Sequence, residues 1–192
     1  GDGRTQLDFN AIAQGYTVDM LIHLLMESGI ENAMVELGGE VRCIGVNLKG
    51  LPWRIAVDKP VINDGTGGRP LQAVLEVQNA SVCTSGNYRK FKEIDGVRVS
   101  HTIDPRTGYP AYHALLSVTI QAGSAAIADA YATACMVLGP KEGRAFIDRM
   151  RKEKSGAPIE ALFIIDAGVN ATLDAPFEFW ATEGWKEAII WL

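Results

Sequence analysis

Residues 124–138 constrain the fold most, because they read as a helix with apolar side chains on almost every side. The interior is Ala, Ile, Tyr, Met, Val and Cys except at Asp129 and Thr133, and Gly139 and Pro140 end the segment. A helix that is apolar nearly all round is buried. The 192 residues are enough to build one domain with a substantial core around such a helix.

The rest of the chain mixes helices and strands. A helix is predicted over residues 11–28 from the spacing of Ile12, Tyr16, Leu21, Leu24 and Leu25, with Asn10 as its N-cap and Gly29 just past its end, and another over residues 142–152. Strands are predicted at residues 7–9, 33–37, 41–45, 53–57, 71–77, 81–84, 117–122, 162–166 and 171–173, the last two as a hairpin.

Turn signals complete this pattern. Asp95-Gly96 predicts a tight hairpin between residues 88–94 and 97–103, and residues 63–70 read as a Gly-rich loop. The tryptophan-rich residues 177–192 are expected to pack on the sheet. Because strands and helices do not alternate as βαβ units, the sequence predicts an α+β fold with antiparallel-rich sheets packed against helices, in one domain over residues 1–192.

Charge and composition exclude several classes of protein. The net charge is −5 and no basic run occurs, so a nucleic-acid partner is not expected. The three cysteines have no C-x-x-C spacing, which argues against a structural zinc site. No run of 18 apolar residues and no secretory signal pattern is found. Since the chain begins at Gly1, we expect a mature form, a trimmed form or a fragment.

Asp129 and Thr133 are the polar exceptions of the apolar helix. Four residues apart, they project from one face. A carboxylate with a hydroxyl is a hard-oxygen pair suited to Mg²⁺ or Ca²⁺. The ordinary alternative is an Asp that caps a neighbouring segment and a Thr bonded back to its own helix.

His101 precedes an Asp-Pro-x-Thr-Gly turn at residues 104–108. Its imidazole could accept a proton from a hydroxyl nucleophile; the alternative is a structural histidine beside an Asx-turn. His23 and His113 lack such a context and are taken as structural. Glycine turns at residues 37–40 and 84–87 could aim N–H groups at a phosphate, or only reverse the chain.

In this order the motifs resemble those of the FAD:protein FMN transferases, the ApbE-like flavin transferases. The matching segments are residues 7–19 (LDFNAIAQGYTVD), 36–40 (ELGGE), 84–88 (TSGNY), 100–108 (SHTIDPRTG), 117–119 (SVT) and 128–139 (ADAYATACMVLG). The resemblance implies an ApbE-like, T-fold-like architecture. It also implies an enzyme that cleaves FAD, attaches FMN through a phosphoester to a Thr or Ser of a target flavoprotein, and releases AMP.

The resemblance also assigns residues. Mg²⁺ would be held by Asp129, Thr133 and the backbone carbonyl of Ala13, and His101 would be the base for the acceptor hydroxyl. Candidates to line the FAD site are Gly38, Gly39, Glu40, Thr84, Ser85, Gly86, Ile103 and Asp104. Two alternatives stay open: a Mg²⁺-dependent FAD pyrophosphatase, and a flavin-binding protein without catalysis.

Two departures from the family pattern stand out. Phe9-Asn10 replaces a common Gly-Gly, and Gln14 replaces a Lys, which removes a positive charge near the phosphates. Family members also carry a further N-terminal part that includes some of the FAD pocket, so we expect this chain to be the C-terminal portion of a longer protein. By the same resemblance, targets would include subunits of redox complexes. The expected location is the periplasmic side of the cell envelope, with any lipoprotein anchor in the missing part.

Overall fold

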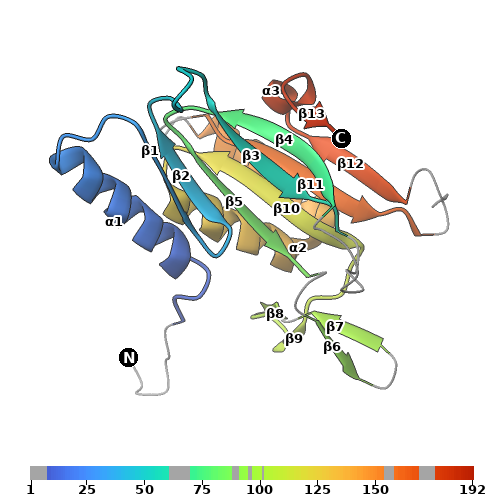
Figure 1. The fold of residues 1–192 in the computed structure, drawn as a ribbon. Helices are drawn as coiled ribbons and strands as arrows, with labels where there is room; N and C mark the ends of the chain where they lie inside the picture. Colours follow the sequence, from blue (N-terminus) through green and yellow to red (C-terminus); the bar gives the residue numbers. More distant parts are fainter. Residues whose placement is uncertain are drawn as a thin grey trace, which may run out of the picture.

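A six-stranded antiparallel sheet forms the centre of the molecule (Figure 1). The computed structural model describes residues 8–60, 70–87, 91–94, 97–100, 102–153, 158–168 and 176–192. In sheet order the strands are β1 (Ala33–Leu37), β2 (Glu40–Ile44), β5 (Ser81–Gly86), β10 (Leu115–Ala122), β11 (Glu160–Asp166) and β12 (Phe177–Ala181). Every neighbouring pair is antiparallel. The predicted α+β class with antiparallel sheets is confirmed.

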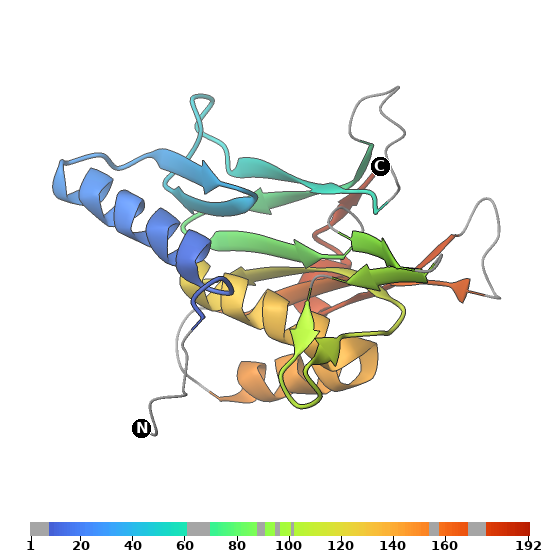
Figure 2. The same ribbon diagram turned by 90° about the horizontal axis from the view of Figure 1, so that it is seen from below.

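Two long helices cover one face of this sheet and a smaller sheet covers the other (Figure 2). The helices are α1 (Ala13–Glu27) and α2 (Ala125–Lys152), and the smaller sheet has the order β13 (Ile190–Trp191), β4 (Leu71–Val77), β3 (Trp53–Asp58). The remaining elements are the hairpins β6 (Phe91–Ile94) with β7 (Val97–Ser100) and β8 (Ile103–Asp104) with β9 (Tyr109–Pro110), and the short helix α3 (Glu183–Lys186).

Strand β11 is buried on both faces, because a core lies on each side of the central sheet. Phe163 belongs to the core beneath α2, whereas Leu162 and Ile164 belong to the core beneath the smaller sheet, and all three are fully buried. Alternate residues of a strand point to opposite faces, so one strand serves both cores. The α2 side of the core also contains Ala128 and Ala132, which confirms that this apolar helix is buried.

Gly139 divides α2 into the two helices that the sequence predicts. Its φ of 79° and ψ of −179° are not helical, and Pro140 follows. A Cβ at Gly139 would lie 3.0 Å from Cδ2 of His113, so the kink is also closely packed. His113 donates from Nε2 to the Met136 carbonyl (2.8 Å) and accepts the Leu115 N–H at Nδ1, which gives it a structural role.

We expect Gly139→Ala to lower the free energy of unfolding by roughly 2–4 kcal/mol, because a side chain there meets both a strained backbone and a close neighbour. Gly29→Ala is the matched control. Gly29 has a φ of 80° but no atom within 4 Å of an added Cβ, so only a backbone cost of about 1 kcal/mol is expected. Urea denaturation measures both. Equal losses in the two variants would contradict the packing argument.

Several expected boundaries differ from the structure. Asn10 is not the N-cap of α1: the helix begins after Ile12, which makes no side-chain cap, while the Asn10 N–H donates to Asp8. Asp8 and Phe9 form no strand. The reason is a turn in which the Phe9 carbonyl accepts the N–H groups of Ile12 and Ala13.

The C-terminal region does more than pack on the sheet. Residues 177–181 pair with β11 as the edge strand β12, and residues 190–191 join the smaller sheet. The predicted strand at residues 171–173 lies outside the described residues, as do nearly all of the predicted loop at 63–70 and the turn residues Asp95 and Gly96. The flanking strands β6 and β7 confirm that hairpin. Among the helices of the described ranges, none has the length and apolar character needed to cross a membrane.

Candidate functional site

Asp129 joins α2 to the first turn of α1. Its side chain is buried in the apolar helix, 4% exposed, and Oδ2 accepts the Gly15 N–H at 3.1 Å. Burial raises the pKa of Asp129, and the Gly15 N–H offsets this in part. In the described part of the chain no cationic side chain pairs with this carboxylate. A buried carboxylate of this kind is costly unless a cation joins it.

Thr133 lies one turn further along α2 and faces strand β5. Its hydroxyl lies 3.2 Å from that of Ser85. Thr84 points to the opposite face of the sheet, where its hydroxyl pairs with Thr119 at 2.9 Å. The structure therefore brings Ser85 to the Asp129–Thr133 pair but not the side chain of Thr84, while Gly86 ends the same strand.

The structure bears on both interpretations of Asp129 and Thr133, a cation site and purely structural contacts. Asp129 does satisfy an N–H in the first turn of a neighbouring helix, where four N–H groups lack helical partners. The Thr133 hydroxyl does not hydrogen-bond to a carbonyl of its own helix, which the structure describes in full. It pairs with the Ser85 hydroxyl on strand β5 instead. A structural contact and a cation site are compatible here, because a carboxylate has more than one lone pair to share.

The glycine turn between β1 and β2 lies against the first turn of α1. Gly38 has a φ of 69°, and a Cβ there would lie 2.1 Å from Nε2 of Gln14. The Gly39 N–H donates to the Glu36 carboxylate at 2.7 Å, so this group is already engaged within the hairpin. Glu40 follows as a buried acid, 7% exposed. The loop thus places Gln14, the residue that departs from the family Lys, directly at the turn.

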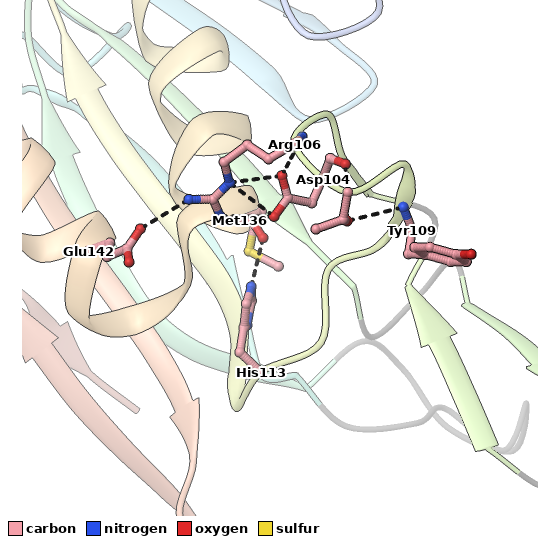
Figure 3. Close-up of polar contacts among 7 residues, drawn as sticks. Asp104, Arg106, Tyr109, His113, Met136 and Glu142 are labelled. Carbon is pink, nitrogen blue, oxygen red and sulfur yellow. Dashed lines mark hydrogen bonds and ion pairs between the residues drawn. The ribbon is translucent and has the colours of Figure 1, made fainter.

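Asp104, which follows Ile103 in β8, lies in a second cluster at the far end of the first half of α2 (Figure 3). Asp104 binds Arg106 through two contacts of 2.8 and 3.1 Å at Oδ2, and Arg106 reaches Glu142 at 3.4 Å. Arg106 holds the pKa of Asp104 below its ordinary value. The Arg106 N–H also donates to Asp104, so the Asx-turn is present. Ile103 is half-exposed.

A groove of about 410 Å³ runs between this turn and the kink of α2, with His113 and Gly139 among its lining residues. His101, two residues before Ile103, lies outside the described residues. The structure therefore describes the turn that follows His101, and the proposed role of His101 itself stays a prediction.

Asp19 is a buried acid to which sequence reasoning gave no role. It is 6% exposed and accepts the N–H groups of Ala125 (2.9 Å) and Ala126 (3.0 Å), the Ser124 hydroxyl, and an ion pair from Arg42. Burial alone would raise the pKa of Asp19, but these donors hold it below its ordinary value. From α1, Asp19 thus caps the N-terminus of α2. The signal that identified Asp129, one acid in an apolar helix, was also available at Asp19.

Asp129 and Thr133 fit a Mg²⁺ site by their chemistry, whereas the Ala13 carbonyl already accepts the Thr17 hydroxyl at 2.8 Å. The buried carboxylate lacks a cationic side chain, the hydroxyl lies one turn away, and Ala13 is two residues before Gly15. Within the described ranges no three His, Cys, Asp or Glu residues gather as a metal cluster. A one-carboxylate site still suits Mg²⁺, which keeps several positions for water and substrate phosphates.

Comparison with known proteins shows the family of the chain. A model of the ApbE family matches residues 2–157. The chain belongs to the ApbE family. An FAD:protein FMN transferase of Vibrio cholerae is 45% identical over 139 residues, which cover 72% of this chain and 40% of that protein.

Solved ApbE structures agree with the fold. The apo flavinyl transferase ApbE of Pseudomonas stutzeri matches with a TM-score of 0.75 and 38% identity, over 95% of this chain and 51% of that one. The ApbE protein of Thermotoga maritima matches with a TM-score of 0.77 and 29% identity, over 95% and 53%. The chain therefore spans about half the length of these ApbE relatives, or less. The predicted ApbE-like architecture is confirmed.

If Asp129 and Thr133 hold Mg²⁺, Ser85→Ala is expected to raise the Mg²⁺ concentration needed for half-maximal activity about tenfold, because the Ser85 hydroxyl pairs with that of Thr133. Ser28→Ala is the matched control: it removes an exposed hydroxyl that donates to the Leu24 carbonyl at the end of α1, and little effect is expected. Titrating activity against Mg²⁺ compares the two variants. If both behave alike, Ser85 has no specific link to the metal.

Proposed function

We propose that this chain carries the metal and phosphate chemistry of a Mg²⁺-dependent FAD:protein FMN transferase. The observation that carries the proposal is Asp129, a buried carboxylate with one N–H donor and no cationic side chain in the described structure, beside the hydroxyl of Thr133. The proposed reaction is that of the Vibrio cholerae relative, an FAD:protein FMN transferase.

The acceptor oxygen, from a Thr or Ser of a target flavoprotein, would attack the FMN-side phosphorus of the FAD pyrophosphate. The new P–O ester forms as the P–O bond to the AMP phosphate breaks, and AMP leaves with the electron pair of that bond. His101 would take the proton of the attacking hydroxyl. Bound Mg²⁺ would neutralise pyrophosphate oxygens as charge develops on the leaving group.

Different parts of this chain would bind the metal ion and the FAD. Asp129, Thr133 and the Ala13 carbonyl would hold the ion at the joint of α1 and α2. The turn with Gly38-Gly39 and the end of strand β5 at Ser85-Gly86, which is extended where a turn was predicted, approach this joint, which supports a role in holding FAD. Ile103 and Asp104 would contribute to FAD binding from the β8–β9 hairpin, whose turn is held by the ion pairs of Arg106.

The test incubates the protein with FAD, Mg²⁺ and a flavoprotein subunit that carries an acceptor threonine. An Mg²⁺-dependent FMN adduct on the subunit, absent with EDTA, is the expected result. Free FMN and AMP without an adduct would instead indicate a pyrophosphatase. Tight FAD binding without turnover would indicate a non-catalytic flavin-binding protein.

Partners and location are proposed from the family resemblance alone. The acceptor would be a redox-complex subunit, met on the periplasmic side of the cell envelope. Membrane attachment, if present, would come from a lipoprotein anchor outside this chain. Fractionation of cells that produce the full-length protein tests the location: finding it in the cytoplasm would contradict this proposal.

A further inference from the structure

Helix α1 has an apolar side that nothing in the described structure covers. Its four buried residues are Gly15, Val18, Asp19 and Ile22, which form a single stripe against α2 and the sheet. On the other side lie four large apolar residues, here named the α1 stripe: Tyr16 (58% exposed), Met20 (48%), Leu21 (43%) and Leu24 (58%).

This exposed side lacks the charges of a solvated helix. The 15 residues of α1 include two acids and no Lys or Arg, and one of the acids, Asp19, is buried. The second half of α2 shows the contrast, since residues 141–152 include seven charged side chains besides its buried stripe. A helix with apolar residues on both sides is normally buried on both sides. The α1 stripe therefore has the character of an interface.

The neighbouring edge of the central sheet points to what covers the stripe. Strand β1 is the outermost strand beside α1, and within the described ranges only β2 pairs with it (Figure 1). Its residues Met34 and Leu37 are also exposed, 46% and 41%. An open strand edge offers unpaired N–H and C=O groups to a further strand, so this edge and the α1 stripe together form one surface to which more polypeptide can add.

The comparisons show how much of the solved ApbE chains lies outside the match. The chain covers 51% and 53% of two solved ApbE chains, so nearly half of each lies outside the match. We propose that the α1 stripe is the docking surface for that other half of the ApbE fold, a polypeptide that presents an apolar face to α1. This inference rests on family membership and not on the proposed activity.

Two other occupants fit less well. A membrane surface favours helices with Lys and Arg along their polar side, and α1 has neither. A second copy of this chain would bury the α1 stripe without accounting for the nearly half of each solved ApbE chain that lies outside the match. The test is designed so that a second copy gives its own result.

Thiol labelling of Leu24→Cys tests the proposal directly. The natural cysteines, Cys43, Cys83 and Cys135, are buried, so an introduced thiol at an exposed position reacts selectively. The labelling rate is measured in the 192-residue chain and in a fusion of this chain to the unmatched part of the Vibrio cholerae transferase, in that protein's order. Peptide mass spectrometry reads position 24 alone. Leu48→Cys, at a fully exposed residue, is the matched control.

We expect position 24 to label at least about tenfold more slowly in the fusion than in the 192-residue chain, with position 48 unchanged, since burial limits thiol access. Equal rates at position 24 in the two proteins would overturn the proposal. Protection of position 24 in the 192-residue chain that grows with protein concentration would overturn it in favour of a second copy. Circular dichroism verifies that both cysteine variants keep the fold.

Discussion

Asp129→Asn is expected to lower Mg²⁺-dependent activity by at least about a hundredfold without lowering the stability of the metal-free protein. The activity falls because an amide replaces the one carboxylate of the donor set. The stability holds because the Asn side-chain oxygen can still accept the Gly15 N–H, while the buried negative charge is gone. Thermal unfolding with and without Mg²⁺, beside the transfer assay, measures both effects.

The pKa of Asp129 gives the sign of the stability effect. Burial raises the pKa of Asp129 in the folded protein. The free energy of unfolding therefore falls as the pH rises above the ordinary Asp value and the carboxyl ionises. At neutral pH the wild type carries this cost and Asp129→Asn does not. Mg²⁺ should therefore raise the thermal unfolding midpoint of the wild type and leave that of Asp129→Asn unchanged.

Asp148→Asn is the matched control, since Asp148 is an exposed acid on the same helix. It should change neither activity nor the response to Mg²⁺. If Asp129→Asn loses stability in the absence of metal and the wild type gains none from Mg²⁺, Asp129 is a structural cap alone. That result would remove the metal site from the account.

Asp19→Ala is expected to cost about 3–5 kcal/mol of stability, the largest effect of any single substitution considered. The carboxylate binds two N–H groups at the start of α2, the Ser124 hydroxyl and Arg42. Its removal leaves those N–H groups and a mostly buried guanidinium without their acceptor. Denaturant unfolding measures the loss.

Lys186→Ala removes an exposed ion pair with Glu183 and is the control, with an expected loss of less than about 1 kcal/mol. The pH dependence adds a second check. The folded-state pKa of Asp19 lies below the ordinary value of 3.8, so its stabilisation is present above that pH and is lost as the pH falls through the folded-state pKa. The gap between wild type and variant should shrink in acid; a gap that is constant down to pH 2 would contradict the ion-pair account.

The elements that local patterns specify were predicted well. The strand at 71–77 was predicted with its observed bounds, and Gly29, with a φ of 80°, lies just past the end of α1 as predicted. The buried helix around Asp129 and Thr133 follows from composition alone. Such features depend on a few neighbouring residues, so one sequence is enough to find them.

What failed depended on distant partners. The apolar series of residues 12, 16, 21, 24 and 25 predicted a helix correctly, yet Tyr16, Leu21 and Leu24 lie on the exposed side of α1 and residue 25 is half-buried. Gly15 and Asp19 face the core instead, because a Cβ at Gly15 would lie 2.4 Å from the Ala125 carbonyl oxygen and Asp19 caps α2. The contact of the two helices, more than a hundred residues apart in sequence, selects this face, and local periodicity cannot reveal it.

The intact mass of a threonine-bearing acceptor flavoprotein, after incubation with FAD and Mg²⁺, tests the central claim most directly. Both the 192-residue chain and its fusion to the unmatched part of the Vibrio cholerae transferase are assayed, with EDTA and Asp129→Asn as controls. The account predicts a mass gain of one FMN moiety that requires Mg²⁺ and disappears with Asp129→Asn. Intact FAD and an unmodified acceptor with both proteins, or an adduct that Asp129→Asn still forms at the wild-type rate, would contradict it.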